Sequence, residues 1–368
     1  MLSIRPTQLR VDLSAIRHNV REVAEAAAPA KVLAVVKANA YGHGAVQVSQ
    51  AALEAGADML AVALIEEGAQ LRQAGVTAPI LMLGTTDVHA AEAAVEYDVT
   101  PVVFLPEVLF APESAAAKKG VCASAQIKID TGMNRIGVRT EEELSAVLDA
   151  VAKCPHVRIT GALTHFATAD VPESDFGGEQ IARFERMTAL MRARGLNFER
   201  HAAASAAAVR YPQARYDRVR AGIVMYGIDP LGQLDVRPAL RWTTRVSYVK
   251  TIESGDTVSY GRRFTAARPT RIATLPVGYA DGYRRSFSNR AQVLLHGRRV
   301  PVVGSVCMDQ VMVDATGLDV QMGDEAVLLG RQGEEEISCC ELAQLDGTIP
   351  YEIMTGISAR VPRVYEQQ

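Results

Sequence analysis

The residue with the clearest chemical potential is Lys37, which ends the apolar run VLAVVK and precedes a glycine-containing turn. At the end of a buried strand, desolvation disfavours the charged form of a lysine. Its pKa therefore falls, and its amine becomes suited to Schiff-base formation. The alternative is a structural lysine whose stem covers apolar surface while its ammonium reaches water. Position alone does not separate these two interpretations.

Polar residues also stand in three later apolar runs. Lys128 and Asp130 alternate along SAQIKID, so they share one face of the expected strand. His165 lies in ITGALTHF and Arg220 in DRVRAG. Taken singly, His165 is more typical of a hydrogen-bonded core histidine, and Arg220 of a structural ion pair.

The elements that must position these residues alternate over the first two-thirds of the chain. Alanine-rich segments of helical periodicity separate eight short apolar runs, which end at Lys37, Leu64, Gly84, Phe104, Asp130, Phe166, Ser205 and Gly222. This alternation predicts parallel strands covered by helices, and eight repeats favour a (β/α)8 barrel of the TIM type. A doubly wound open sheet is the rival, although no G-x-G-x-x-G follows the first run. In a barrel, the C-terminal strand ends form the active-site face.

The pattern changes after residue 232. Short β-branched runs separated by Gly-Asp and His-Gly turns predict a C-terminal, mostly-β domain. A chain of 368 residues exceeds the size of most single cores. We therefore expect two domains, an α/β barrel over residues 1–232 that carries Lys37 and a β domain over residues 233–368. The strand-like piece Arg10–Leu13 could pair with the second domain.

Composition limits the possible partners. The formal net charge is -3, from 39 basic and 42 acidic residues, so no overall field favours nucleic acid or an anionic membrane. No apolar stretch is long enough to span a membrane, and the N-terminus lacks the apolar region of a secretory signal. Five cysteines without disulfide or zinc spacing predict free thiols, no metal site and a cytoplasmic protein.

A set of motifs in a fixed order resembles the alanine racemases. The set comprises VVKANAYGHG around Lys37, then KIDTGMNRIG (128–137), LTHF (163–166), RAGI (220–223), VSYG (258–261), VGYADG (277–282), VCMD (306–309), PYEIM (350–354) and RVPR (360–363). Other pyridoxal-phosphate barrels, including some amino-acid decarboxylases, carry segments similar to the lysine motif. The ordered set together with the β domain covers essentially the whole chain and is highly specific.

The resemblance implies a two-base reaction on pyridoxal 5'-phosphate, which Lys37 would carry as a Schiff base. Lys37 would act as one base and Tyr260 of the partner subunit as the other. A phenol is a weak base at neutral pH, so cationic neighbours would have to stabilise its anion. The family places His165 and Arg220 in a hydrogen-bonded chain with Tyr260. Arg220 would also meet the pyridine nitrogen and keep it unprotonated, which limits side reactions such as transamination.

The resemblance also implies which residues bind the cofactor. Hydroxyl donors would be Tyr41, Ser205 and Tyr351, and the phosphate would meet the backbone N–H groups of Gly222 and Ile223. The chain departs from the family at Ala204, where relatives usually have asparagine.

Substrate recognition is implied in the same way. The substrate carboxylate would meet Arg135 and the backbone N–H of Met308 from the partner subunit. Tyr279, Cys307 and Asp309 match the partner-side lining of the entrance. In many relatives the lysine that matches Lys128 is carbamylated. We expect the same here, because a bare ammonium at Lys128 would repel Arg135.

The resemblance therefore favours a homodimeric alanine racemase that interconverts L- and D-alanine, for peptidoglycan synthesis or for D-alanine breakdown. A racemase of broader small amino acids remains open, because Arg135 would bind any α-carboxylate. A decarboxylase on the same barrel would need a carboxylate where Arg220 stands. A non-enzymatic pyridoxal-phosphate carrier would lack the β domain and its VSYG segment.

Overall fold

The computed structural model describes residues 5–85 and 88–367. Their contacts divide them into two compact units. The first, the barrel unit, holds Ser14–Ala40 and Ala45–Arg237. The second, the β unit, holds the described residues up to Leu13, Tyr41–Gly44 and the residues from Pro238 onward.

The barrel unit is built on one sheet of eight parallel strands in the order β8-β7-β6-β5-β4-β3-β2-β9. Its two end strands meet, because the N–H of Asp217 donates to the carbonyl of Arg200 and the N–H of Arg220 to that of Ala203. All eight apolar runs form strands, so the predicted (β/α)8 barrel is confirmed. The strands are β2 (Lys31–Val35), β3 (Ala57–Val62), β4 (Ile80–Met82), β5 (Val99–Val103), β6 (Ala123–Lys128), β7 (Val157–Leu163), β8 (Glu199–His201) and β9 (Arg218–Ala221).

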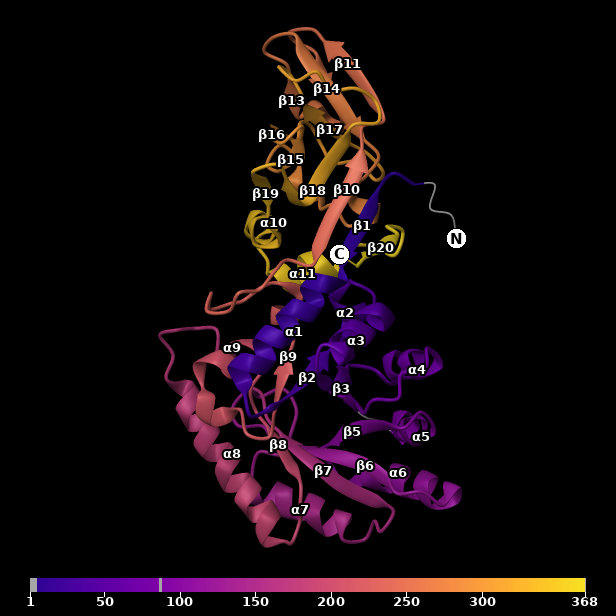
Figure 1. Cartoon of the computed structure of the whole chain (residues 1–368), viewed down its shortest axis with the longest axis vertical. Coiled ribbons are helices and arrows are strands. Elements are labelled where there is room, and N and C mark those ends of the chain that lie inside the picture. The colour runs from indigo at the N-terminus through magenta and orange to yellow at the C-terminus, as the bar shows by residue number, and fades with distance from the viewer. Residues whose placement is uncertain (1–4, 86–87, 368) are drawn as a thin grey trace. The chain divides into compact units, whose positions relative to one another are not determined.

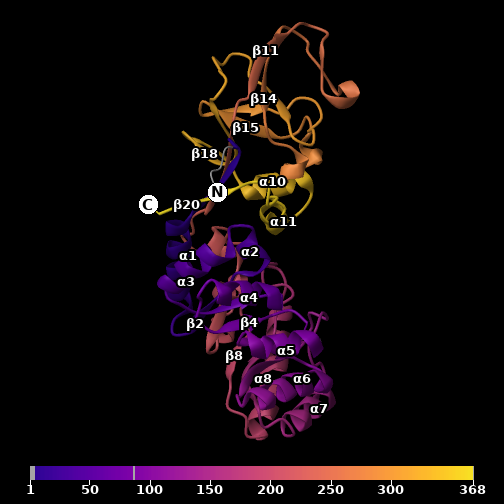
Figure 2. The same ribbon diagram turned by 90° about the vertical axis from the view of Figure 1, so that its right-hand side faces the viewer.

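Helices cover the outside of this sheet, as Figures 1 and 2 show for α4, α5 and α6. Local signals set their ends. Thr140 and Glu143 form a capping box at the start of α7, and Gly120 ends α6 with a φ of 66°. The helices are α1 (Leu13–Ala27), α2 (Lys37–Tyr41), α3 (Ala45–Glu54), α4 (Ile65–Gln73), α5 (Val88–Glu96), α6 (Pro106–Lys119), α7 (Glu141–Val151), α8 (Phe176–Ala193) and α9 (Ser205–Arg210).

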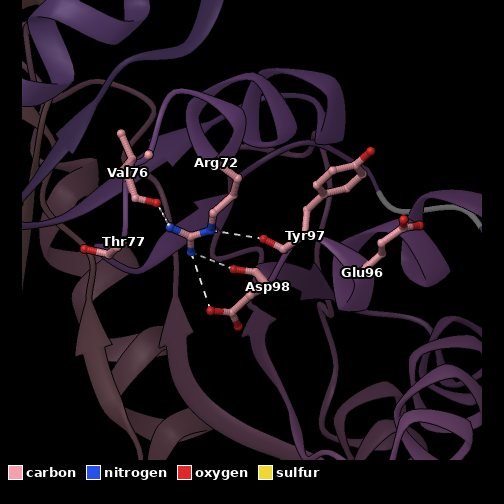
Figure 3. A pocket seen from close by; sticks show the side chains of 7 residues that line it. Arg72, Val76, Thr77, Glu96, Tyr97 and Asp98 are labelled. Atoms are coloured by element: carbon pink, nitrogen blue, oxygen red, sulfur yellow. Dashed lines mark hydrogen bonds and ion pairs between the residues drawn. The ribbon is translucent and has the colours of Figure 1, made fainter.

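Arg72 of α4 joins the segments that lead into β4 and β5 (Figure 3). Its guanidinium donates to the carbonyls of Val76, Ala78, Tyr97 and Asp98 at 2.7 to 3.0 Å, and it lies 3.6 Å from the Asp98 carboxylate. A hollow lined by these residues lies at the N-terminal ends of the strands, the end of a barrel associated with stability. The arginine therefore joins loops rather than binding a ligand.

The β unit contains a seven-stranded sheet in the order β16-β15-β18-β10-β1-β20, with β19 paired to β18. Strand β1, from the N-terminus, runs antiparallel to β10 and parallel to β20 (Figure 1). The prediction that this piece pairs with the C-terminal domain is confirmed. The strands of this sheet are β1 (Gln8–Asp12), β10 (Leu240–Arg245), β15 (Gln292–Leu295), β16 (Arg298–Pro301), β18 (Glu325–Gln332), β19 (Glu335–Ile337) and β20 (Arg363–Glu366).

The rest of the β unit consists of two smaller sheets and short helices. An aromatic cluster lies in its core, with Tyr283 packed edge-on against both Trp242 and Phe287 at centroid distances of 5.9 and 5.0 Å. In the part of the chain that the structure describes, no helix is long and apolar enough to cross a membrane. The remaining elements are β11 (Tyr248–Ile252), β14 (Thr270–Leu275) and β17 (Val311–Asp314), the pair β12 (Thr257–Val258) and β13 (Phe264–Thr265), and helices α10 (Cys339–Asp346) and α11 (Pro350–Thr355).

Candidate active site

Lys37 begins α2, two residues beyond the end of β2, and a left-handed turn follows it. Ala38, Asn39, Ala40 and Tyr41 have φ values of 52°, 53°, 53° and 52°. Left-handed backbone costs an L-residue roughly 1–2 kcal/mol, so such a turn persists only where its surroundings hold it. The N–H of Ala38 donates to Glu67 Oε1 at 2.5 Å, and Asn39 Oδ1 accepts the N–H of Ala45 at 2.8 Å.

The amine of Lys37 lies in a cationic, partly buried environment. Burial lowers its pKa, and the charges of Arg135 and Arg220 lower it further, while Glu67 opposes this shift. A larger share of the amine is therefore neutral than for a lysine in water. A neutral amine at a C-terminal strand end is the form that attacks a carbonyl carbon.

Arg220, on β9, is the centre of a buried hydrogen-bond network and is only 3% exposed. One terminal nitrogen donates to the carbonyl and Nδ1 of His201, at 2.7 and 3.0 Å. The other donates to the carbonyls of Thr164 and Ala202 and to Nδ1 of His165, at 2.7 to 3.1 Å. Burial, with a smaller effect of Arg135, lowers the pKa of Arg220 to about 10, so the guanidinium is charged at neutral pH. Within the described residues, its Nε–H meets no acceptor.

The two histidines beside Arg220 are neutral. Burial lowers the pKa of both well below the usual range, and the charge of Arg220 adds to the effect. A guanidinium only donates, so Nδ1 accepts in each ring and Nε2 carries the proton. In His201 that nitrogen donates to Gln126 Oε1 at 2.7 Å. His165 keeps an Nε2–H to offer.

Lys128 ends β6 and is buried among charges, with 7% of its surface exposed. No hydrogen bond of its amine occurs among the described residues. Burial lowers its pKa well below the usual range, as do the charges of Arg220 and Arg135, and Asp130 opposes the shift. Asp130 is occupied with the following loop, because its carboxylate accepts the backbone N–H groups of Gly132, Asn134 and Arg135 at 2.9 to 3.0 Å.

A further group of candidate residues lies where β8 and β9 end. Gly222 follows β9, and its N–H donates to the Ser205 hydroxyl oxygen at 3.1 Å. The Ser205 O–H is then available to another acceptor. Ile223 begins a short 3-10 helix, and Ala204 caps α9 without a side-chain hydrogen bond.

Several candidates from the β unit are exposed. Tyr260 is 73% exposed and Met308 is 52% exposed. Tyr279 is held beside the VCMD segment, because its N–H donates to the carbonyl of Cys307 at 3.0 Å. Asp309 accepts a 2.7 Å hydrogen bond from Arg360.

Tyr260 lies outside the strand that precedes it. Strand β12 ends at Val258, and Tyr260 begins a 3-10 turn, Tyr260–Arg262. Ser259 separates the two with a φ of 66°, which an extended strand cannot accommodate.

Tyr41 and Tyr351 lie together in the β unit. Their ring centroids are 5.7 Å apart. Burial raises the pKa of Tyr41, and Tyr351 raises it further, so its phenol is protonated and able to donate. Gly42 follows in the sequence, and a Cβ there would stand 2.5 Å from the carbonyl oxygen of Met354, which leaves no room for a side chain.

The barrel unit thus brings five predicted residues into one electrostatic group, namely Lys37, Lys128, Arg135, His165 and Arg220. Sequence reasoning missed Gln126, His201 and Glu67. A histidine inside the apolar run ERHAAAS was a usable signal for His201, whereas Glu67 stands in an ordinary acidic first helical turn. Over residues 5–85 and 88–367, no cluster of histidine, cysteine, aspartate or glutamate could hold a metal ion.

A parallel barrel with a low-pKa lysine just beyond one strand and a buried guanidinium on another, continued by a β-rich unit, defines a class of lysine-based barrel enzymes. Comparison with known proteins identifies the family. The model for the alanine racemase N-terminal domain matches residues 11–230, and that for the C-terminal domain matches residues 239–365. The chain therefore belongs to the alanine racemase family, and the resemblance noted in the sequence is confirmed.

Relatives match along nearly the full length. The chain is 48% identical to alanine racemase of Symbiobacterium thermophilum, over 98% of this chain and 97% of that protein. It is 45% identical to alanine racemase of Carboxydothermus hydrogenoformans, over 98% and 100%. Among solved structures, alanine racemase from Bacillus anthracis with bound L-Ala-P has a TM-score of 0.95 and 38% identity, covering 100% of this chain and 97% of that one. Alanine racemase from Bartonella henselae with covalently bound pyridoxal phosphate has a TM-score of 0.88 and 30% identity, over 98% and 99%.

Proposed function

We propose that this chain interconverts L- and D-alanine, using pyridoxal 5'-phosphate bound to Lys37. The observation that carries this proposal is a lysine that follows a barrel strand within the charge field of buried Arg220. Both terminal nitrogens of Arg220 are hydrogen-bonded, whereas its Nε–H meets no acceptor among the described residues. In the proposed enzyme, the barrel unit (Ser14–Ala40 and Ala45–Arg237) carries the active site, and the β unit completes the site of a partner. Free thiols at all five cysteines fit a cytoplasmic enzyme.

The donor set of the barrel unit fits the cofactor. The Lys37 amine, in its neutral form, would bond to its aldehyde carbon with loss of one water, and the Arg220 Nε–H would donate to its pyridine nitrogen. The Ser205 O–H and the Ile223 N–H would hold its phosphate, and Gly222, whose N–H donates to the Ser205 oxygen, would orient that hydroxyl. Tyr41 and Tyr351, in the β unit, would add hydroxyl donors. When bound, the cofactor would withdraw electrons from the substrate Cα and make its proton acidic.

The chain's own residues would then move a proton at Cα. Once the substrate amine has replaced it on the cofactor, the freed Lys37 amine would accept or give the proton on one face, and Tyr260 of the partner subunit on the other. Charged Arg220 would keep the pyridine nitrogen unprotonated, since a guanidinium rarely gives up its own proton. This arrangement restrains electron withdrawal by the ring and limits side reactions, and it argues against a decarboxylase, which would need a carboxylate there.

Arg135 would bind the substrate carboxylate, together with the Met308 N–H of the partner subunit. A carbamate on Lys128 would help, because an anion there would pair with the Arg135 guanidinium and satisfy a buried group that otherwise meets only cations and Asp130. Tyr279, Cys307 and Asp309 of the partner would line the entrance. An electron-density map at high resolution with bicarbonate present would test the carbamate, and a bare ammonium would exclude it.

Exposure in the β unit supports a homodimer with shared sites. Large side chains at Tyr260, Tyr279 and Met308 are exposed within one chain, as expected for a surface that covers a partner's barrel. Dilution below the dimer dissociation constant should then abolish racemisation. Full activity in a proven monomer would refute the shared site.

The Tyr260→Phe variant tests the function itself. Removing the phenol oxygen should abolish most turnover in both directions, because one base is lost, while the absorbance of bound cofactor stays. The Tyr248→Phe variant, another exposed tyrosine of the β unit, is the matched control. Unchanged racemisation in Tyr260→Phe would contradict the two-base proposal. A panel of small L-amino acids would measure substrate breadth.

A further inference from the structure

The residue before Tyr260 has an unusual backbone. Ser259 has φ 66° and ψ -176°, a region that glycine tolerates and other residues enter only under constraint. The energetic cost of such a conformation is of order 1–3 kcal/mol. Contacts within the β unit must therefore hold it.

A reciprocal pair of serine hydrogen bonds supplies that constraint. The Ser259 hydroxyl donates to the carbonyl of Ser305 at 2.7 Å, and the Ser305 hydroxyl donates to the carbonyl of Tyr260 at 2.9 Å. Ser305 is 2% exposed, so both bonds depend on a buried residue. The two segments are thereby joined at two consecutive residues, Ser259 and Tyr260.

Neighbouring contacts fix the same segments. Gly304 packs so closely that a Cβ there would stand 2.7 Å from the carbonyl oxygen of Val258. Asn289 links both sides, because its Oδ1 accepts the N–H of Gly304 at 2.6 Å and its Nδ2 donates to the carbonyl of Arg263 at 2.8 Å. The backbone at Tyr260 is thus held on either side, although its ring is exposed.

We propose that Ser305 and Ser259 are positioning residues that fix the backbone of Tyr260 and so aim its phenol at the substrate of the partner subunit. This inference rests on the proposed role of Tyr260 as a base. Within one chain the ring makes no hydrogen bond among the described residues, so the backbone sets where the phenol is presented to the partner subunit. A reacting group displaced by about 1 Å can lose on the order of a hundredfold in rate.

The test compares Ser305→Ala with Ser247→Ala in the cofactor-loaded enzyme. Ser247, also in the β unit, donates its hydroxyl to the carbonyl of Thr274 at 3.0 Å, a bond of the same kind that does not reach Tyr260. Ser305→Ala should lower kcat/KM by tenfold to a hundredfold, whereas Ser247→Ala should leave it unchanged. Ser305→Thr keeps the hydroxyl and should restore most of the rate. Wild-type kcat/KM in Ser305→Ala would overturn the proposal.

Kinetic isotope effects distinguish a displaced Tyr260 phenol from a general loss of stability. With Cα-deuterated alanine, Ser305→Ala should raise the primary isotope effect for one enantiomer only, because Tyr260 would remove the proton from one face only. Equal changes for both enantiomers, or rate losses that follow the thermal unfolding midpoint across the variants, would contradict a positioning role.

A double-mutant cycle keeps this inference distinct from the proposed function. In the Tyr260→Phe background, Ser305→Ala should have no further effect, because the phenol that it positions is gone. An equal loss in both backgrounds would refute positioning. If Tyr260→Phe retained full activity, the proposed base would fail instead. Ser259→Gly and Ser259→Ala both lose the hydroxyl, but glycine accepts φ 66°, so Ser259→Gly should be the more stable variant and should still lose activity.

Discussion

Glu67 offers the sharpest test of how the barrel unit holds its lysine. One carboxylate oxygen accepts the N–H of Ala38 at 2.5 Å, and the other accepts those of Ala63 and Leu64 at 2.7 and 3.2 Å. Glu67 therefore joins the residue after Lys37 to the end of β3. Its negative charge also raises the pKa of Lys37. The Glu67→Gln variant keeps the shape, removes the charge and keeps only one of the two acceptor oxygens.

The expected loss follows from these contacts. With its oxygen turned toward Ala63 and Leu64, glutamine would present an NH2 group to the Ala38 N–H. One charge-assisted hydrogen bond would be lost, which costs about 1.5–3 kcal/mol, and the lower end applies because water can reach the exposed Ala38 N–H. Glu66, in the same first helical turn but solvent-exposed, should lose only its interaction with the helix dipole in Glu66→Gln, about 0.3–1 kcal/mol. The difference between the two variants is therefore about 1 kcal/mol.

Two measurements check this reasoning. Urea unfolding of both variants at one cofactor concentration gives the difference in the free energy of unfolding. Acetylation of Lys37 in the cofactor-free protein, followed against pH by peptide mass spectrometry, reports the pKa of its amine. Without the Glu67 anion that pKa should fall, so Lys37 should react at lower pH in Glu67→Gln than in Glu66→Gln. Equal stability and equal reactivity in the two variants would refute this account of the turn.

Three further predictions concern stability. His165 and His201 are neutral in the fold because their pKa values are lowered. Below about pH 6.5 the unfolded chain therefore binds more protons than the folded chain. The free energy of unfolding should decrease as the pH is lowered, by up to about 2.7 kcal/mol per pH unit. Urea titrations between about pH 5 and pH 7 measure this slope, and His201→Asn should roughly halve it. A free energy of unfolding that does not change with pH would show that the histidines are protonated in the fold. Ala204→Asn should stabilise α9 by about 1 kcal/mol through a new cap, seen as a higher thermal midpoint, and a lower midpoint would mean that the amide does not fit. Arg72→Lys should lower the free energy of unfolding by about 3 kcal/mol, measured by heat or urea, because an ammonium cannot reach four carbonyls. The kcat should stay unchanged. A change in kcat would connect the loops of Figure 3 to catalysis.

Much of the barrel could be predicted from the sequence because its strands are buried on both faces. Each appears as a short continuous apolar run, as in β2, where Val32–Val35 are all buried. The β unit was harder to resolve. Its runs are shorter, and one of them stops at Val258 because the next residue has a positive φ that side-chain type does not reveal.

The candidate site was predictable where a polar residue interrupts an apolar run. Lys37, His165 and Arg220 are anomalous in that way, and family resemblance supplied their proposed roles. Glu67 and Ser305 gave no such signal, because their partners are backbone groups far away in the sequence. A hydrogen bond to a main-chain atom can be made by any residue type in the partner position, so the sequence does not indicate it.

The left-handed turn at Ala38–Tyr41 has a consequence for chirality in the chain itself. A backbone with φ near 52° is the mirror image of ordinary helix and is the natural geometry of a D-residue. Ala38 is exposed, so inverting its Cα by chemical synthesis would disturb little packing and should remove roughly 1–2 kcal/mol of steric conflict. The backbone at Ala38 thus accommodates D-alanine better than the L-alanine that is encoded there. This position directly follows Lys37, the residue that we propose to take part in interconverting the two enantiomers of alanine.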